Sequence, residues 1–281
     1  MRIGKYSVKV FESDYFKLDG GAMFGIIPKP LWEKTNPADE VNRIAMSTRI
    51  ILLEWDNEKM LIDTGMGEKW DAKSREIYAI DPETTLEKRL KLHGIDSSQI
   101  TKVLLTHLHF DHTGGSVVEK DGKLLPAFQN ARYFVQKNNF EWGINPSDRD
   151  RGSYIKNNFL PLMQEGLLEL IDEKETEFLD GIALHKLNGH TFGQQAIKIS
   201  DSSNNLFFCA DLIPTHGHLP LPYIMGYDLQ PLVTLQEKNE VLAKAVEEDW
   251  TLILQHDPAI AAVKVEKTDR GYKIREKLTD I

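Results

Sequence analysis

Three histidines and an aspartate lie within six consecutive residues, in the stretch THLHFDHTGG from Thr106 to Gly115. The whole chain contains only nine histidines. In an extended segment His107 and His109 point the same way, and after a change of backbone direction Asp111 and His112 face a second point close by. Imidazole nitrogens and carboxylates are ligands that zinc and similar divalent ions accept. The spacing therefore predicts a metal site at this point of the chain.

Three later segments offer further ligands, each after an apolar run that is typical of a strand. They are GHTFGQ with His190, CADL with Asp211 and LQHD with His256. Taken singly, a histidine at a strand end is more often a hydrogen-bonded surface residue, and Asp211 alone could belong to a turn or a helix cap. Together with the first cluster they supply seven ligands, which is enough for two metal ions that share one bridging carboxylate.

These motifs, in this order, resemble the metallo-β-lactamase superfamily of metal-dependent hydrolases. The earlier stretch LIDTGMG, from Leu61 to Gly67, matches the Asp-Thr-Gly turn of that family, and the resemblance covers roughly residues 45 to 258. It implies an α/β protein with an αββα four-layer sandwich, in which two mixed sheets are flanked by helices and the site lies at one edge.

The resemblance also implies a role for each ligand. Two divalent ions would be bound as follows: His107, His109 and His190 on the first, Asp111, His112 and His256 on the second, and Asp211 bridging both. Asp63 would orient a ligand histidine through a hydrogen bond. Zinc is the expected metal, with manganese, iron and cobalt as alternatives.

Two departures from the family pattern bear on the substrate. Asp211 stands where the antibiotic-cleaving members carry a metal-binding cysteine, so β-lactamase activity is not expected. The ligand spacing resembles the N-acyl-homoserine lactone lactonases and, nearly as well, the organophosphate-hydrolysing branch. The lactonase pattern has a tyrosine shortly after the bridging aspartate, whereas here the first is Tyr223. We expect His218, or failing that Tyr223, to supply the missing hydrogen-bond donor, and His216 is a further candidate for substrate contact.

These observations predict a binuclear metal-dependent hydrolase. Two ions that share a water lower its pKa towards neutrality, and the bridging hydroxide would attack a lactone or carboxylic ester such as an acyl-homoserine lactone. Asp111 has a secondary role in passing the proton. The alternatives are a phosphotriester or aryl-ester hydrolase and, more distantly, a metal-stabilised binding protein without catalysis.

Composition limits the other possibilities. The 281 residues suit a single hydrolase domain, with residues 12–45 as a candidate lid or dimerisation extension. As a lid, the apolar stretch Gly20–Trp32 would favour a small hydrophobic substrate, and the alternative is that it packs against its own core. A formal net charge of −9 and the lack of basic runs argue against a nucleic-acid partner. The single cysteine, Cys209, together with the lack of a signal peptide or membrane-length apolar run, predicts a cytoplasmic protein without a membrane partner. A homodimer is the candidate oligomer.

Short β-rich runs dominate the chain, with helical spacing in two places. We expect helices over 84–94 and 231–248, and strands over 5–11, 48–55, 59–63, 102–107, 131–136, 181–187, 195–200, 205–212 and 249–257.

Overall fold

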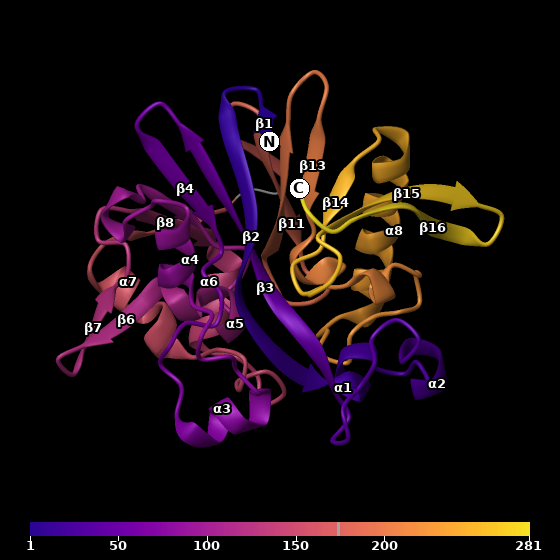
Figure 1. Cartoon of the computed structure of the whole chain (residues 1–281), viewed down its shortest axis with the longest axis horizontal. Helices are drawn as coiled ribbons and strands as arrows, with labels where there is room; N and C mark the ends of the chain where they lie inside the picture. The colour runs from indigo at the N-terminus through magenta and orange to yellow at the C-terminus, as the bar shows by residue number, and fades with distance from the viewer. Residues whose placement is uncertain (173–174) are drawn as a thin grey trace. The chain divides into compact units, whose positions relative to one another are not determined.

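Two seven-stranded sheets account for most of the regular structure in the computed structural model, which describes residues 1–172 and 175–281 (Figure 1). The chain divides into two compact units. The first comprises Met1–Tyr15 and Thr48–Glu173, and the second comprises Phe16–Ser47 and Lys174–Ile281. In the described part of the chain, no helix is long and apolar enough to span a membrane.

The sheet of the first unit is mixed. Its strand order is β1 (Arg2–Ile3), β2 (Tyr6–Asp19), β3 (Arg43–Trp55), β4 (Glu58–Ile62), β5 (Lys102–Leu104), β8 (Arg132–Gln136) and β9 (Leu168–Ile171). The pairs β4–β5, β5–β8 and β8–β9 are parallel, whereas β1–β2 and β3–β4 are antiparallel. A separate hairpin joins β6 (Val117–Lys120) to β7 (Lys123–Pro126).

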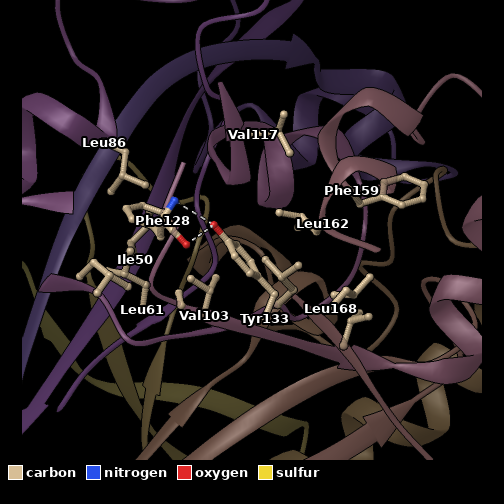
Figure 2. Packing of buried hydrophobic residues seen from close by; sticks show 14 of the residues in the cluster. Ile50, Leu61, Leu86, Val103, Val117, Phe128, Tyr133, Phe159, Leu162 and Leu168 are labelled. Carbon is tan, nitrogen blue, oxygen red and sulfur yellow. Dashed lines mark hydrogen bonds between the residues drawn. The ribbon is translucent and has the colours of Figure 1, made fainter. Parts of the chain in front are cut away.

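Five helices accompany this sheet in the described part of the first unit, and all but the first of them bury at least one residue. They are α3 (Ala72–Tyr78), α4 (Leu86–Leu92), α5 (Phe110–Thr113), α6 (Lys137–Ile144) and α7 (Leu160–Gln164), with short 3₁₀ turns η1 (Ser97–Gln99), η2 (Gly114–Ser116) and η3 (Lys156–Asn158). Figure 2 shows the shared core, to which Leu86 of α4, Leu162 of α7 and strand residues such as Val103 all belong. Inside it the Tyr133 hydroxyl accepts a 3.0 Å hydrogen bond from the Phe128 amide, so this buried polar group is satisfied.

The second unit has a mixed sheet of its own. Its strands follow chain order: β10 (Glu175–Leu179), β11 (Ile182–Leu187), β12 (Gln194–Ser200), β13 (Asn205–Phe208), β14 (Thr251–Ile253), β15 (Ala262–Thr268) and β16 (Gly271–Leu278). Only the β13–β14 pair is parallel among its pairings in the described residues. The crossover between these two strands contains η4 (Ala210–Leu212), η5 (His216–His218) and the long helix α8 (Pro231–Glu247), which packs beside β15.

Helix α8 begins with a proline, whose fixed φ and missing N–H suit a first turn. Val241, Leu242 and Ala245 on its inner face join a core in which Phe207 stacks on Trp250 at 4.8 Å. The short helices α1 (Gly20–Phe24) and α2 (Lys29–Trp32) also belong to the second unit.

Both expected helices and all nine expected strands are present, with changes at their ends. Thr85 caps α4 by accepting from the Lys88 amide, and Gly94 follows its last turn with φ 72°. The strands before the ligands are shorter than expected, however. β5 ends at Leu104 and β13 at Phe208, so Cys209 and Asp211 do not share a strand face. Cys209 is a buried core residue.

Two backbone segments of the first unit meet without room for side chains. The turn that contains Gly67, with φ 64°, lies against Gly114, the residue after α5. A Cβ on Gly114 would lie 1.8 Å from the Met66 carbonyl oxygen, and Gly115 donates to the Gly65 carbonyl. These glycines therefore let the Asp63 turn approach the histidine stretch.

We predict that Gly114→Ala destabilises the protein by about 1–3 kcal/mol, because the new methyl group collides with backbone that cannot rotate away. Urea unfolding would measure the change. Gly152→Ala is the matched control, since nothing lies within 4 Å of its added Cβ. Equal stability of both variants would contradict the close approach.

Candidate metal centre

The histidine stretch of the first unit lies beyond the end of β5 and enters α5 at His109. His107 Nε2 lies 3.0 Å from His109 Nδ1, so these two ring nitrogens converge on one region. Both side chains are buried. The Nδ1 of His107 lies 3.1 Å from the Thr106 hydroxyl, which leaves Nε2 as its inward-facing atom.

Asp111 and His112 lie on the single turn of α5, where the backbone changes direction as expected. An Asp111 carboxylate oxygen is 3.7 Å from His112 Nε2. His112 Nδ1 is 2.9 Å from Asp63, whose carboxylate also accepts from the amide and the hydroxyl of Thr106 at 2.7 Å each. Since a carboxylate only accepts, the proton of His112 lies on Nδ1 and Nε2 is a lone-pair donor. Asp63 therefore lies where an orienting acid would have to lie.

A second buried acid supports the turn that carries Asp63. Asp14 accepts hydrogen bonds from the Ser13 hydroxyl at 2.6 Å, the Thr48 hydroxyl at 2.8 Å and the Met66 amide at 3.1 Å. Burial raises the pKa of Asp14 to about 6, although these hydrogen bonds oppose the shift. The sequence gives no signal for this residue, because it sits in an ordinary strand pattern.

The second unit contributes His190, Asp211 and His256, all buried. Asp211 lies in η4, with one oxygen 2.9 Å from His256 Nε2 and the other 3.1 Å from His190 Nε2. The carboxylate thus faces one imidazole with each of its oxygens. A bridging role for Asp211 stays a prediction.

Each of these two histidines has a fixed acceptor at its other nitrogen. His190 Nδ1 donates to Asp228 at 2.8 Å, and His256 Nδ1 donates to the backbone carbonyl of Ser47 at 2.8 Å. Sequence reasoning missed both partners. An acid in the otherwise apolar loop before α8 was the available signal for Asp228, whereas Ser47 acts through its backbone and leaves none.

The tautomers of His190 and His256 suit the binding of a cation beside Asp211. With Nδ1 protonated, the Nε2 lone pairs of His190 and His256 both point at the anionic oxygens of Asp211. Lone pairs at 2.9–3.1 Å repel one another unless positive charge lies between or beside them. Oriented neutral imidazoles around a buried carboxylate are the donor set of a divalent metal.

Comparison with known proteins identifies the family. The family model described as the metallo-beta-lactamase superfamily matches residues 44–256. The chain belongs to the metallo-β-lactamase superfamily. It has the metallo-β-lactamase fold, with mixed sheets and helices of the α/β class, which confirms the fold expected from the motifs.

Its relatives include lactonases. An N-acyl homoserine lactonase, AttM, from Rhizobium radiobacter is 25% identical over 183 residues, which are 64% of this chain and 66% of the relative. The match therefore spans just under two thirds of that relative.

Among solved structures, a probable metal-dependent hydrolase from Staphylococcus aureus has a TM-score of 0.89 at 29% identity, covering 99% of this chain and 98% of the other. AidC, a dizinc quorum-quenching lactonase in complex with its product N-hexanoyl-L-homoserine, has a TM-score of 0.80 at 22% identity, covering 98% and 95%. The first resemblance extends over nearly the full chain.

The residues expected to contact substrate differ in their surroundings. His218 is buried. Its Nε2 donates to the Met23 carbonyl at 2.9 Å, its Nδ1 lies 2.8 Å from the Thr215 hydroxyl, and its ring stacks on Phe24 at 4.2 Å. A donor role for His218 stays a prediction, and it would require the Met23 bond to break. His216 makes a very short contact with Asp257 through Nδ1.

Tyr223 is half-buried, and its ring edge meets Phe24 at 6.3 Å. Its hydroxyl has no hydrogen-bond partner within the part of the chain that the structure describes. The two candidate donors therefore differ, because the hydrogen of His218 is already used and that of Tyr223 is not.

The apolar stretch Gly20–Trp32 packs partly on its own unit. Phe24 stacks on Trp32 at 5.2 Å, and both rings are buried, whereas Ile26 is 93% exposed and Leu31 48% exposed. A lid or dimer contact by this stretch stays a prediction.

We predict that His218 makes stability depend on pH. Burial lowers the pKa of His218 to about 3, whereas an unfolded histidine titrates near its usual 6.5. Below pH 6.5 the unfolded state therefore binds a proton on this histidine that the native state does not bind. The free energy of unfolding falls as pH falls from 6.5 to 3. From pH 7.5 to 5.5 this single group costs about 1.4 kcal/mol.

His218→Gln removes the titration and keeps a polar side chain of similar reach. Urea unfolding of both metal-free proteins at pH 7.5 and 5.5 would measure the difference. The parent should lose more stability than the variant, by about 1.4 kcal/mol. Parallel losses would show that His218 is charged in the native protein.

Proposed function

We propose that the chain is a binuclear metal-dependent hydrolase that opens lactones or carboxylic esters, with an acyl-homoserine-lactone-like substrate. The observation that carries this proposal is the Asp211 carboxylate, which turns one oxygen towards the lone pair of His190 and the other towards that of His256. We assign the ligands as the family pattern suggests: His107, His109 and His190 for one ion, Asp111, His112 and His256 for the other, and Asp211 for both. Zinc is the proposed metal.

When bound, such ions polarise a carbonyl oxygen and bring the pKa of a water to about 7. The chain's own residues then supply orientation and proton transfer. Asp63 and Asp228 fix the rings of His112 and His190, and Asp211 faces the imidazoles of His190 and His256. As water adds to the carbonyl carbon, Asp111 takes its proton and returns it to the leaving ring oxygen when the C–O bond breaks.

Two features support a lactone or ester over other substrates. The lactonase relatives are named for this reaction, and the buried aromatic stack of Phe24 and Trp32 belongs to an apolar segment suited to an acyl chain. The net charge of −9 disfavours polyanionic substrates. A cytoplasmic location and a homodimer remain proposals from the sequence.

The deciding experiment compares hydrolysis of N-hexanoyl-homoserine lactone with that of a paraoxon-like phosphotriester, after loading with zinc, manganese, iron or cobalt. We expect ring opening of the lactone to have the higher kcat/KM. A faster triester reaction would assign the chain to the phosphotriesterases instead. If metal-loaded protein turned over neither of these nor simple aryl esters, a binding role would replace the hydrolase proposal.

We predict that Asp211→Asn loses at least one of two bound ions and most activity, because an amide cannot neutralise charge between two cations. Elemental analysis of the loaded protein would report the ratio of metal to protein, which we expect to be close to two in the parent. Asp148→Asn is the control, since that side chain is 95% exposed. Retention of both ions and full turnover would remove Asp211 from the bridge.

We predict that Tyr223→Phe lowers kcat for the lactone by about 10²–10³-fold, the effect of removing one donor to a developing oxyanion. Metal content should stay at the parental value, because the hydroxyl is no ligand. Tyr272→Phe, on β16, controls for loss of a phenol elsewhere. Unchanged kcat would mean that the metal ions stabilise the oxyanion without help from Tyr223.

A further inference from the structure

Helix α8 carries a lysine that is fully buried. Lys238 donates through Nζ to the carbonyls of Pro220 at 2.8 Å and Tyr223 at 2.9 Å, and more weakly to that of Leu221 at 3.4 Å. Burial lowers the pKa of Lys238 to about 7, because a charge is less well solvated there than in water. An ammonium has three hydrogens and no acceptor, so three converging carbonyls match its capacity.

The preceding residue of the same helix, Glu237, binds a different segment, which leads to His190. Glu237 accepts from the Asn188 amide at 2.7 Å and the Gly189 amide at 3.0 Å. These two residues directly precede His190. Glu237 is acceptor-only and the segment offers amides, so the pairing is again matched in kind.

Backbone contacts near Glu237 hold the same segment against the start of α8. The Gln230 amide donates to the Gly189 carbonyl at 2.9 Å, and the Leu229 amide donates to the His190 carbonyl at 3.0 Å. Gly189 lies so close to α8 that a Cβ would meet the Thr234 amide nitrogen at 2.4 Å. The backbone before His190 therefore rests directly on the first turns of the helix.

The segment held by Glu237 and the loop held by Lys238 are joined by one side-chain hydrogen bond. The loop that Lys238 holds continues to Asp228, and Asp228 accepts from His190 Nδ1 at 2.8 Å. Glu237 thus holds the segment that carries the imidazole, while Lys238 holds the loop that leads to its acceptor. Any shift between these segments would lengthen the bond that sets the direction of His190 Nε2.

We propose that Glu237 and Lys238 are a pair of positioning residues, which fix from one helix the His190–Asp228 hydrogen bond and the place of Tyr223. Neither residue touches the reacting atoms. The link to metal binding and turnover rests on the proposed function, whereas the hydrogen bond itself can be tested without it.

Two near-isosteric variants separate the contacts. Lys238→Met keeps the stem and removes all three hydrogen bonds of Nζ, although the Pro220 carbonyl keeps its bond from the Tyr223 amide. Glu237→Gln turns an NH₂ group towards one of the two amides. The matched controls lie on the exposed side of α8: Lys244→Met and Glu240→Gln. If Lys238→Met does not fold, Glu237→Gln still tests the pair, because it retains volume and one of its two hydrogen bonds.

The first readout is independent of metal and activity. In metal-free parent protein the proton on His190 Nδ1 should give a slowly exchanging NMR signal, assigned by its loss in Asp228→Asn. We expect this signal to be lost or exchange-broadened in both test variants and retained in both controls. A parental signal in folded test variants would overturn the proposal.

The second readout is metal affinity, measured by competition with a chromophoric chelator. We expect the affinity of the more weakly held ion to fall about 10-fold or more in the test variants, as for other residues that orient ligands. Test variants that keep both the NMR signal and parental affinity, and lose only stability, would make the pair merely structural. If the parent itself binds no metal, the proposed function fails, and the NMR comparison alone then decides on the positioning pair.

Discussion

The hydrogen bond at the Nδ1 atom of three candidate ligand histidines is the constraint on which the candidate centre depends. His112, His190 and His256 each donate from Nδ1 to a fixed oxygen, at 2.9, 2.8 and 2.8 Å. This bond selects the tautomer and the ring plane together, so Nε2 presents a lone pair in a set direction. An imidazole without such an acceptor could rotate or change its tautomer.

Each of these three acceptor oxygens is held in place by a different part of the structure. Asp63 takes two hydrogen bonds from Thr106, at the ends of the parallel strands β4 and β5. Ser47 offers a backbone carbonyl of β3, and its amide donates in return to the His256 carbonyl. Asp228 lies in a loop and has no strand to fix its position. In the positioning pair proposed above, Lys238 of helix α8 holds this loop through hydrogen bonds to its carbonyls.

The candidate ligands could be picked out from the sequence, whereas the groups that orient them could not. His107 and His109 are two residues apart in a short motif, and Asp211 ends an apolar run, so residue type and local spacing mark them as candidates. Asp228 orients His190 from 38 residues away, and only the folded loop brings them together. Ser47 contributes a carbonyl that any residue would offer. The strand ends were misplaced for a related reason: hydrophobicity continues through Leu105 and Cys209, where the backbone pairing has already stopped.

His218 illustrates the limit of reasoning from neighbourhood alone. Its position after Asp211 and before an apolar LPLP run suggested a donor aimed at substrate, yet both ring nitrogens have protein partners and the ring is stacked on Phe24. A buried neutral histidine of this kind joins the loop to the N-terminal segment through Met23. The same loop then leaves Tyr223 half-buried with its carbonyl held by Lys238. A donor to substrate needs a fixed backbone and a hydroxyl hydrogen that no protein group accepts. Tyr223 has both, because Lys238 holds its carbonyl and its phenol makes no hydrogen bond in the described part of the chain.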